Sequence, residues 1–264
     1  MARTLSGAIS RRANWALPYS IYMLIFTVLP LVLIGVYAFS DGNGHFTLQN
    51  FIRFFHDRET VNTFLYSIGI AMITTALCIL IGYPVAYILS NKKLNRSEVT
   101  IILFILPMWI NVLIRTLATV SLFDFLRLPL GQGALIFGMV YNYLPFMIYP
   151  VYNVLQKMDH SLVEAAQDLG ATSDQVFRKV IVPLSMPGVY SGILMTFMPT
   201  ISTFAIAELL TSNNIKLFGT IIQDNINNTM WNYGATLSLI MLVIIGMTSL
   251  FTGGKDNSVE GGMI

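Results

Sequence analysis

Six long hydrophobic runs, separated by short polar segments, dominate the sequence. A helix needs about 20 consecutive apolar residues to cross a bilayer, and each run is long enough to do so. The pattern therefore predicts an all-α polytopic membrane protein in which the whole chain, 1–264, forms one transmembrane domain. The predicted spans cover about 17–39, 64–90, 99–122, 134–156, 184–210 and 233–252.

Composition supports this class and narrows the partners. Hydrophobic residues make up 55% of the 264 residues and charged residues only 11%, whereas soluble domains carry about 25% charged residues. The formal net charge of +2 is too small to indicate a nucleic-acid partner, so membrane lipids are the expected surroundings. The single cysteine, Cys78, lies inside the second run, which excludes an internal disulfide.

Lysine and arginine are distributed unevenly among the polar segments, and this unevenness predicts the orientation. An excess of positive residues marks the cytoplasmic side of a membrane protein. With the N-terminus in the cytoplasm, the cytoplasmic segments hold ten of these residues and the outer segments four, while Arg115 falls inside the third run. We therefore expect both termini to be cytoplasmic. The ten are Arg3, Arg11, Arg12, Lys92, Lys93, Arg96, Lys157, Arg178, Lys179 and Lys255, and the four are Arg53, Arg58, Arg127 and Lys216.

An amphipathic segment, 161–183, lies between the fourth and fifth runs on the predicted cytoplasmic side. Ser161 and Glu164 have the spacing of a capping box, which begins a helix by binding its first free N–H groups. Gly170 is expected to end this helix in a left-handed conformation. Four small or apolar residues recur at helical spacing and predict one common face: Leu162, Ala165, Ala166 and Leu169.

A second short helix is predicted in the same segment. Thr172 and Gln175 repeat the capping-box spacing, and Pro183 is expected to end the helix. We call the whole segment the elbow. On its pattern alone, the elbow is more typical of an interfacial helix that tethers two spans, and a docking element for another protein is the alternative.

The elbow also carries a sequence motif. Glu164-Ala165-Ala166, then Gly170, then Pro183 thirteen residues further on, resemble the EAA motif of ABC-importer permeases. In that family this loop is a coupling helix that docks in a groove of a cytoplasmic ATPase subunit. The resemblance therefore implies a role in ATPase coupling for Glu164, Ala165, Ala166, Asp168, Gly170 and Pro183.

Longer segments, at 82–90, 106–115, 141–152 and 162–188, resemble the permeases of spermidine/putrescine importers. The resemblance implies the type I importer fold in a bacterial plasma membrane. It also implies a second, different permease subunit, a dimer of ATPase subunits that binds ATP and Mg²⁺, and an extracytoplasmic polyamine-binding protein. The chain itself would bind no cofactor and would not be an enzyme. A permease for another small cationic or organic solute is the alternative.

A path for polyamines calls for carboxylates and for aromatic faces that attract cations. Each candidate also has a simpler interpretation. Asp124 is spaced to pair with Arg127, Glu208 could reach water from a helix end, and the aromatic residues could be interface anchors. Arg115 would repel a cation, so we expect it to pair with a carboxylate or with carbonyl groups near Pro107. The candidates are Trp109, Asp124, Tyr141, Tyr143 and Glu208.

Enzymatic alternatives lack the residues that they need. An intramembrane protease requires a histidine base or two aspartates inside the membrane, but His45, His56 and His160 lie in predicted loops and the predicted spans contain no aspartate pair. The histidines are not spaced as metal ligands, so no metal site is expected. A P-loop, GxxxxGK[ST], is also absent, and ATP hydrolysis is expected on a separate subunit.

Overall fold

The structure, a computed structural model, describes residues 18–91 and 99–253, with side chains described as far as Ser249. Its elements are helices, and in the described part extended residues pair only at a bridge between Ser40 and Phe46. Five helices are long and apolar enough to span a membrane, and a sixth span results if a bent pair of helices counts as one. The predicted all-α membrane class is therefore confirmed.

The chain divides into two compact units, which are described separately. The first unit comprises 1–57 and 224–242, and the second comprises 58–223 and 243–264. Several residues that support the predicted orientation lie outside the described residues. These are Arg3, Arg11, Arg12, Lys92, Lys93, Arg96 and Lys255.

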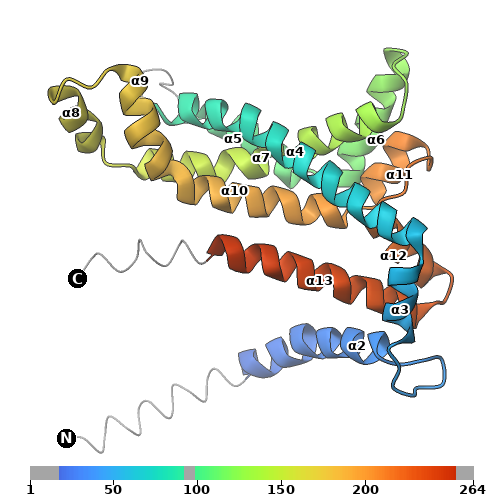
Figure 1. The fold of residues 1–264 in the computed structure, drawn as a ribbon. Helices are drawn as coiled ribbons and strands as arrows, with labels where there is room; N and C mark the ends of the chain where they lie inside the picture. Colours follow the sequence, from blue (N-terminus) through green and yellow to red (C-terminus); the bar gives the residue numbers. More distant parts are fainter. Residues whose placement is uncertain (1–17, 92–98, 254–264) are drawn as a thin grey trace, which may run out of the picture. The chain divides into compact units, whose positions relative to one another are not determined.

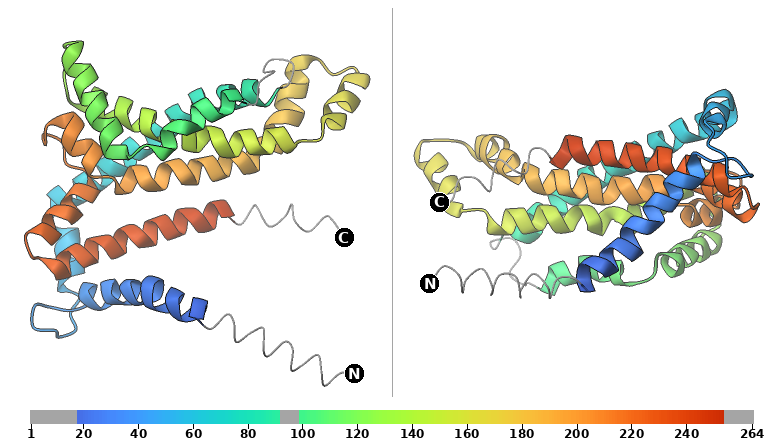
Figure 2. Two further views of the ribbon diagram at one scale, coloured as in Figure 1. Left: turned by 180° about the vertical axis from the view of Figure 1, so that it is seen from behind. Right: turned by 90° about the horizontal axis from the view of Figure 1, so that it is seen from below.

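Three long helices form the core of the second unit. Helices α4 (Arg58–Ser90), α7 (Gln132–Lys157) and α10 (Val182–Ser202) pack against one another, as Figures 1 and 2 show. Glycine allows α10 and α7 to approach each other closely. A Cβ atom at Gly188 of α10 would lie 2.8 Å from the carbonyl oxygen of Pro150 on α7, so no side chain fits between the two backbones.

The third predicted span is not a straight helix. Helix α5 (Val99–Ile105) continues as a 3₁₀ turn, Leu106–Trp109, and α6 (Val112–Phe125) then leaves at an angle of 96°. Asn111 causes a new helix to begin here, because its side chain accepts a hydrogen bond of 2.8 Å from the N–H of Leu113. The predicted span over 99–122 therefore corresponds to a bent pair of helices.

The fifth predicted span, 184–210, is also interrupted. Thr203 is extended, with φ −69° and ψ 143°, and separates α10 from α11 (Ala205–Thr211). In a continuing helix the carbonyl group of Pro199 would bind the N–H of Thr203. It instead accepts hydrogen bonds from the hydroxyl groups of Tyr143, at 3.4 Å, and Ser202, at 3.3 Å. The second unit also contains the first part of α12 (Phe218–Asn227).

The first unit joins the first span to the beginning of the last one. The side chain of Asn232 donates hydrogen bonds to the carbonyl groups of Tyr37, at 3.2 Å, and Ser40, at 2.9 Å. Thr236 donates a further bond of 3.1 Å to the carbonyl group of Ala38. The elements concerned are a π-helical turn, Leu24–Val28, then α2 (Leu29–Ala38), α3 (Gln49–His56) and the first part of α13 (Trp231–Gly253).

Candidate functional site

The first helix of the elbow, α8 (His160–Asp168), is capped two residues earlier than the sequence predicts. Asp159 is the cap, because its backbone is extended and its carboxylate accepts a hydrogen bond of 2.9 Å from the N–H of Ser161. Ser161 is already helical, so the predicted capping box of Ser161 and Glu164 is wrong. The N–H of Ser161 is the main reason that the pKa of the Asp159 carboxyl is lowered.

The turn between the two helices follows the prediction. Gly170 has φ +83°, which is the left-handed conformation that glycine adopts without strain. The N–H of Ala171 donates to the carbonyl group of Ala166 at 3.0 Å and closes the end of α8. Thr172 and Gln175 then form the predicted capping box, with backbone-to-side-chain hydrogen bonds of 3.1 and 3.4 Å.

The second helix of the elbow runs without interruption into α10, so the prediction that Pro183 ends it is wrong. Helix α9 (Ser173–Val176) is followed by a π-helical turn, Phe177–Ile181, in which the N–H of Val182 binds the carbonyl group of Phe177. Pro183 lies inside this continuous helix, directly after the π-helical turn, and the helix continues past it although its missing N–H group removes one helical bond.

The residues of α8 divide between two faces. Val163 and Ala166 pack against the buried cluster formed by the ends of α4, α7 and α10. Leu162 and Leu169 are exposed, Leu169 by 90%, and Ala165 is exposed beside them. The predicted common face is therefore split: Ala166 points inward, and the other three residues form an unpaired outer face with Asp168 exposed at the helix end.

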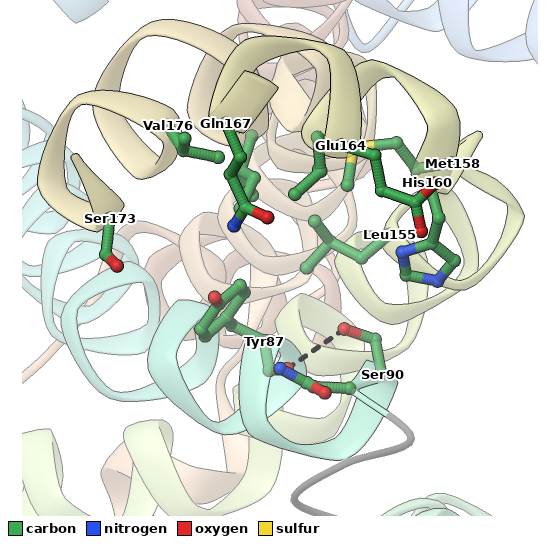
Figure 3. A pocket seen from close by; sticks show the side chains of 12 residues that line it. Tyr87, Ser90, Leu155, Met158, His160, Glu164, Gln167, Ser173 and Val176 are labelled. Carbon is green, nitrogen blue, oxygen red and sulfur yellow. Dashed lines mark hydrogen bonds between the residues drawn. The ribbon is translucent and has the colours of Figure 1, made fainter. Parts of the chain in front are cut away.

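A cavity of about 510 Å³ lies beneath the elbow. Its walls come from α8, from the α9 segment and from the ends of α4 and α7, as Figure 3 shows. Glu164 and His160, one helical turn apart on α8, line it together with Gln167. Apolar side chains, among them Leu155 and Val176, complete the lining. Glu164 therefore borders this cavity, whereas Ala165 belongs to the outer face of the elbow.

The five residues predicted for a substrate path are not gathered into one cluster. No hydrogen bond or ion pair joins any two of them within the described part of the chain. Tyr143 is buried and bonded to the break after α10, and Glu208 is half-buried in the first turn of α11. Trp109, Asp124 and Tyr141 are exposed, and Asp124 forms no side-chain ion pair with Arg127.

Arg115 contacts a carbonyl group, as expected, but not one near Pro107. Its guanidinium, in a side chain only 6% exposed, donates a 3.3 Å hydrogen bond to the carbonyl group of Asn142 on α7. The buried amide of Asn142 donates to the carbonyl group of Gly138 at 2.8 Å. Asn142 is not among the predicted site residues, although an asparagine in the middle of an apolar run is a signal of a buried polar contact.

Comparison with known proteins places the chain in a family. Residues 78–253 match the family model described as "Binding-protein-dependent transport system inner membrane component". The spermidine/putrescine transport system permease protein PotB of Escherichia coli (strain K12) is 32% identical over 253 residues, which cover 87% of this chain and 92% of that protein. PotB of Haemophilus influenzae is 30% identical over 250 residues, which cover 86% and 87%.

Solved structures share the fold at lower identity. A chain of a bacterial ABC transporter that imports the acidic polysaccharide alginate has a TM-score of 0.70 at 16% identity, covering 97% of this chain and 99% of its own. A chain of the MetNI methionine ABC transporter, in an inward-facing conformation, has a TM-score of 0.61 at 18% identity, covering 75% and 95%. With the family model and the two PotB proteins, this likeness shows that the chain belongs to the inner membrane permeases of binding-protein-dependent ABC importers.

Proposed function

We propose that the chain carries polyamines, spermidine or putrescine or both, into the bacterial cell. The support is the likeness over most of the chain to permeases named for these substrates. The fold alone does not indicate that the transported solute is a cation, because the importer of an acidic polysaccharide has the same fold. Glu208, in α11 just after the break, and Tyr143, on α7 with its hydroxyl bonded to the carbonyl group of Pro199, are the residues best suited to receive an ammonium group and an alkyl spacer.

The permease works with partners that hydrolyse ATP and deliver substrate. A dimer of ATPase subunits binds ATP and Mg²⁺, a second and different permease completes the membrane part, and an extracytoplasmic protein binds the polyamine. The family description names dependence on a binding protein, and the alginate transporter has been solved in complex with its periplasmic protein. Both termini and the elbow face the cytoplasm, as the charges of Lys157, Arg178 and Lys179 favour.

The elbow is the part that couples ATP hydrolysis to transport. One observation carries this role: Leu162, Ala165 and Leu169 form an exposed outer face, while the opposite side of α8 is packed against the membrane helices. Ala165 is small enough for a partner to approach the helix backbone closely. ATP binding closes the ATPase dimer, the elbow moves with it, and the path opens outward to receive substrate. Hydrolysis then resets the permease.

Reconstitution in proteoliposomes tests the proposal directly. The chain is co-expressed with its neighbouring genes, and the purified complex is supplied with the binding protein, ATP and labelled solutes. Spermidine or putrescine should be taken up and should stimulate ATP hydrolysis, whereas an amino acid and an oligosaccharide of similar size should do neither. A complex that hydrolyses ATP but responds to another solute would refute the polyamine assignment and leave the coupling role of the elbow intact.

A further inference from the structure

Helix α3 (Gln49–His56), in the first unit, has three distinct faces. One face packs against the rest of the unit: Phe54 is buried, and the side chain of Asn50 donates a 3.1 Å hydrogen bond to the carbonyl group of Ser40. A second face is polar and exposed, and consists of Gln49, Arg53 and His56. The position of α3 on its unit is therefore fixed by packing and by a backbone contact.

The third face of α3 is apolar and exposed. It consists of Leu48, Ile52 and Phe55, which are spaced at i, i+4 and i+7 and therefore lie in one line along the helix. Phe55 is 72% exposed and Phe46, in the preceding loop, 77%. Phe46 stacks on Phe39, with 5.9 Å between ring centroids, and Phe55 meets Phe54 edge-on at 5.1 Å, and both rings remain largely exposed within the first unit. We name Phe46, Leu48, Ile52 and Phe55 the apolar strip.

The place of α3 in the chain limits what can cover the strip. Helix α2 ends at Ala38 and α4 begins at Arg58, and both belong to candidate membrane spans. A link as short as 39–57 keeps α3 at the level where the two spans leave the hydrocarbon. Aromatic residues and helices with one apolar and one charged side are typical of that level. A water-facing helix would leave the strip exposed at a cost of about 25 cal/mol per Å² of apolar surface.

The strip continues onto the exposed apolar surface of the first candidate span. Phe46 also borders a groove of about 470 Å³, together with Val32, Val36 and Phe39 of the first span and its end. Val32 and Val36 are exposed on a candidate membrane span of which only 6% is buried within this chain. Phe46 connects this apolar groove to α3.

We propose that α3 lies flat in the membrane interface, with the apolar strip among the upper acyl segments and Gln49, Arg53 and His56 toward the headgroups and water. The lipid surface is the partner that covers the strip. Arg53 stacks over the ring of Tyr233, 4.3 Å from its centroid, within the same unit, and this contact holds the polar face away from the acyl chains. The helix fixes the depth of the first span in the bilayer, independently of which solute the permease carries.

Site-directed fluorescence tests this placement in the complete complex. Cys78 is the single cysteine, so Cys78→Ala gives a background in which each new cysteine is labelled alone. Cysteines replace Ile52 and Phe55 on the strip, and Gln49 and His56 on the polar face serve as matched controls on the same helix. Each variant carries an environment-sensitive dye and is reconstituted in phosphatidylethanolamine–phosphatidylglycerol vesicles. A lipid with a nitroxide near the top of its acyl chain and aqueous iodide are the two quenchers.

Dyes at Ile52 and Phe55 should be quenched strongly by the nitroxide lipid and only weakly by iodide. Dyes at Gln49 and His56 should be quenched weakly by the nitroxide lipid and several-fold more strongly by iodide than those at Ile52 and Phe55. Equal quenching by iodide at all four positions would show that the strip faces water, which overturns the proposal. Protection of Ile52 and Phe55 from both quenchers would overturn it too, because a protein such as the second permease would then cover the strip. Because two positions are labelled on each face, the comparison can still be made if one variant fails to assemble.

Discussion

At Gly170 the backbone conformation, rather than the surrounding space, determines which residues are tolerated. Its φ is +83°, and a Cβ atom added there would meet no other atom within 4 Å. A side chain is therefore tolerated by its surroundings and penalised only by the left-handed backbone, at about 1–2 kcal/mol for most residues. Asparagine pays less because its side chain tolerates this conformation.

Gly170→Val should loosen the turn of the elbow and reduce both binding of the ATPase subunits and substrate-stimulated ATP hydrolysis, because a β-branched residue is disfavoured at positive φ. Gly170→Asn is the matched control and should keep most of both activities. Pull-down of the ATPase and hydrolysis in proteoliposomes measure the outcome. Equal behaviour of the two variants would show that the turn geometry has no part in coupling.

Asp159→Ala should fray the first turn of α8, whereas Ser161→Ala should leave it nearly intact, because Asp159 supplies the cap. The N–H of Ser161 lowers the pKa of the Asp159 carboxyl below its ordinary 3.8. The cap therefore contributes fully above the ordinary value and is lost only as pH falls through the lowered one. Hydrogen exchange of residues 160–168 at neutral pH measures the difference, and the reverse order would restore Ser161 as the cap.

Glu208→Gln should slow polyamine uptake by roughly tenfold or more, because a charge-assisted hydrogen bond is worth about 1.5–3 kcal/mol. Assembly with the ATPase and basal hydrolysis should remain, since Glu208 lies in α11, apart from the elbow. Asp124→Asn, at an exposed position, is the matched control and should transport normally. Uptake at the wild-type rate in Glu208→Gln would return this residue to the interpretation of a helix-end carboxylate.

At the scale of elements, contact between α7 and α10 depends on glycine. The atoms nearest to a Cβ at Gly188 are backbone atoms, the carbonyl oxygen of Pro150 at 2.8 Å and the Cα of Val151 at 3.0 Å. A side chain at this position could not be accommodated by rotation of a neighbouring side chain. One helix would have to shift, and both pack with α4 in the core of the unit.

Gly188→Ala should therefore lower the melting temperature of the purified complex, because overpacking destabilises the folded state by typically about 1–3 kcal/mol. Gly133→Ala, in the first turn of α7, is the matched control, because a Cβ there would meet nothing within 4 Å. Thermal unfolding in detergent, followed by light scattering or by dye labelling of Cys78, measures both variants. An unchanged melting temperature for Gly188→Ala would mean that the two helices separate easily.

The sequence predicts these elements well wherever hydrophobic length decides them. The second, fourth and sixth runs each correspond to one long helix. It predicts poorly where a single polar contact redirects the chain: Asn111 caps a new helix at the 96° bend, and Tyr143 takes the carbonyl group that would have continued α10. The prediction for Pro183 failed because the helix continues through a π-helical turn directly before the proline, and the spacing of the sequence does not reveal such a turn.

The candidate site divides in the same way. Gly170 and the Thr172 capping box are local features, so their spacing was enough to predict them. The division of α8 into an inner and an outer face needed the tertiary structure, because Ala165 and Ala166 are alike in sequence and differ only in what they contact. The five candidates for the substrate path were chosen by residue type alone, and no contact among the described residues brings them together.

At the scale of the whole molecule, the orientation across the membrane is a prediction from charge. A cysteine at Asn214 should react with a membrane-impermeant thiol reagent on intact cells, whereas a cysteine at Asn95 should not. Asn214 is exposed and avoids Asn213, whose φ is +62°; Asn95 lies outside the described residues. Native Cys78 is buried and should not react. Labelling at Asn95 alone would reverse the orientation.

The uninterrupted helix from Ser173 to Ser202 has a mechanical consequence. Thirty residues without a break amount to a length of about 45 Å, and the helix approaches the backbone of α7 closely at Gly188. The helix continues through the π-helical turn at Phe177–Ile181 and through Pro183, so no extended residue separates the elbow from Thr203. The first break in the helix is Thr203, immediately before the helix that carries Glu208. If the elbow moves with a partner, as proposed, one helix without an intervening loop connects that movement to the segment that carries the acidic residue.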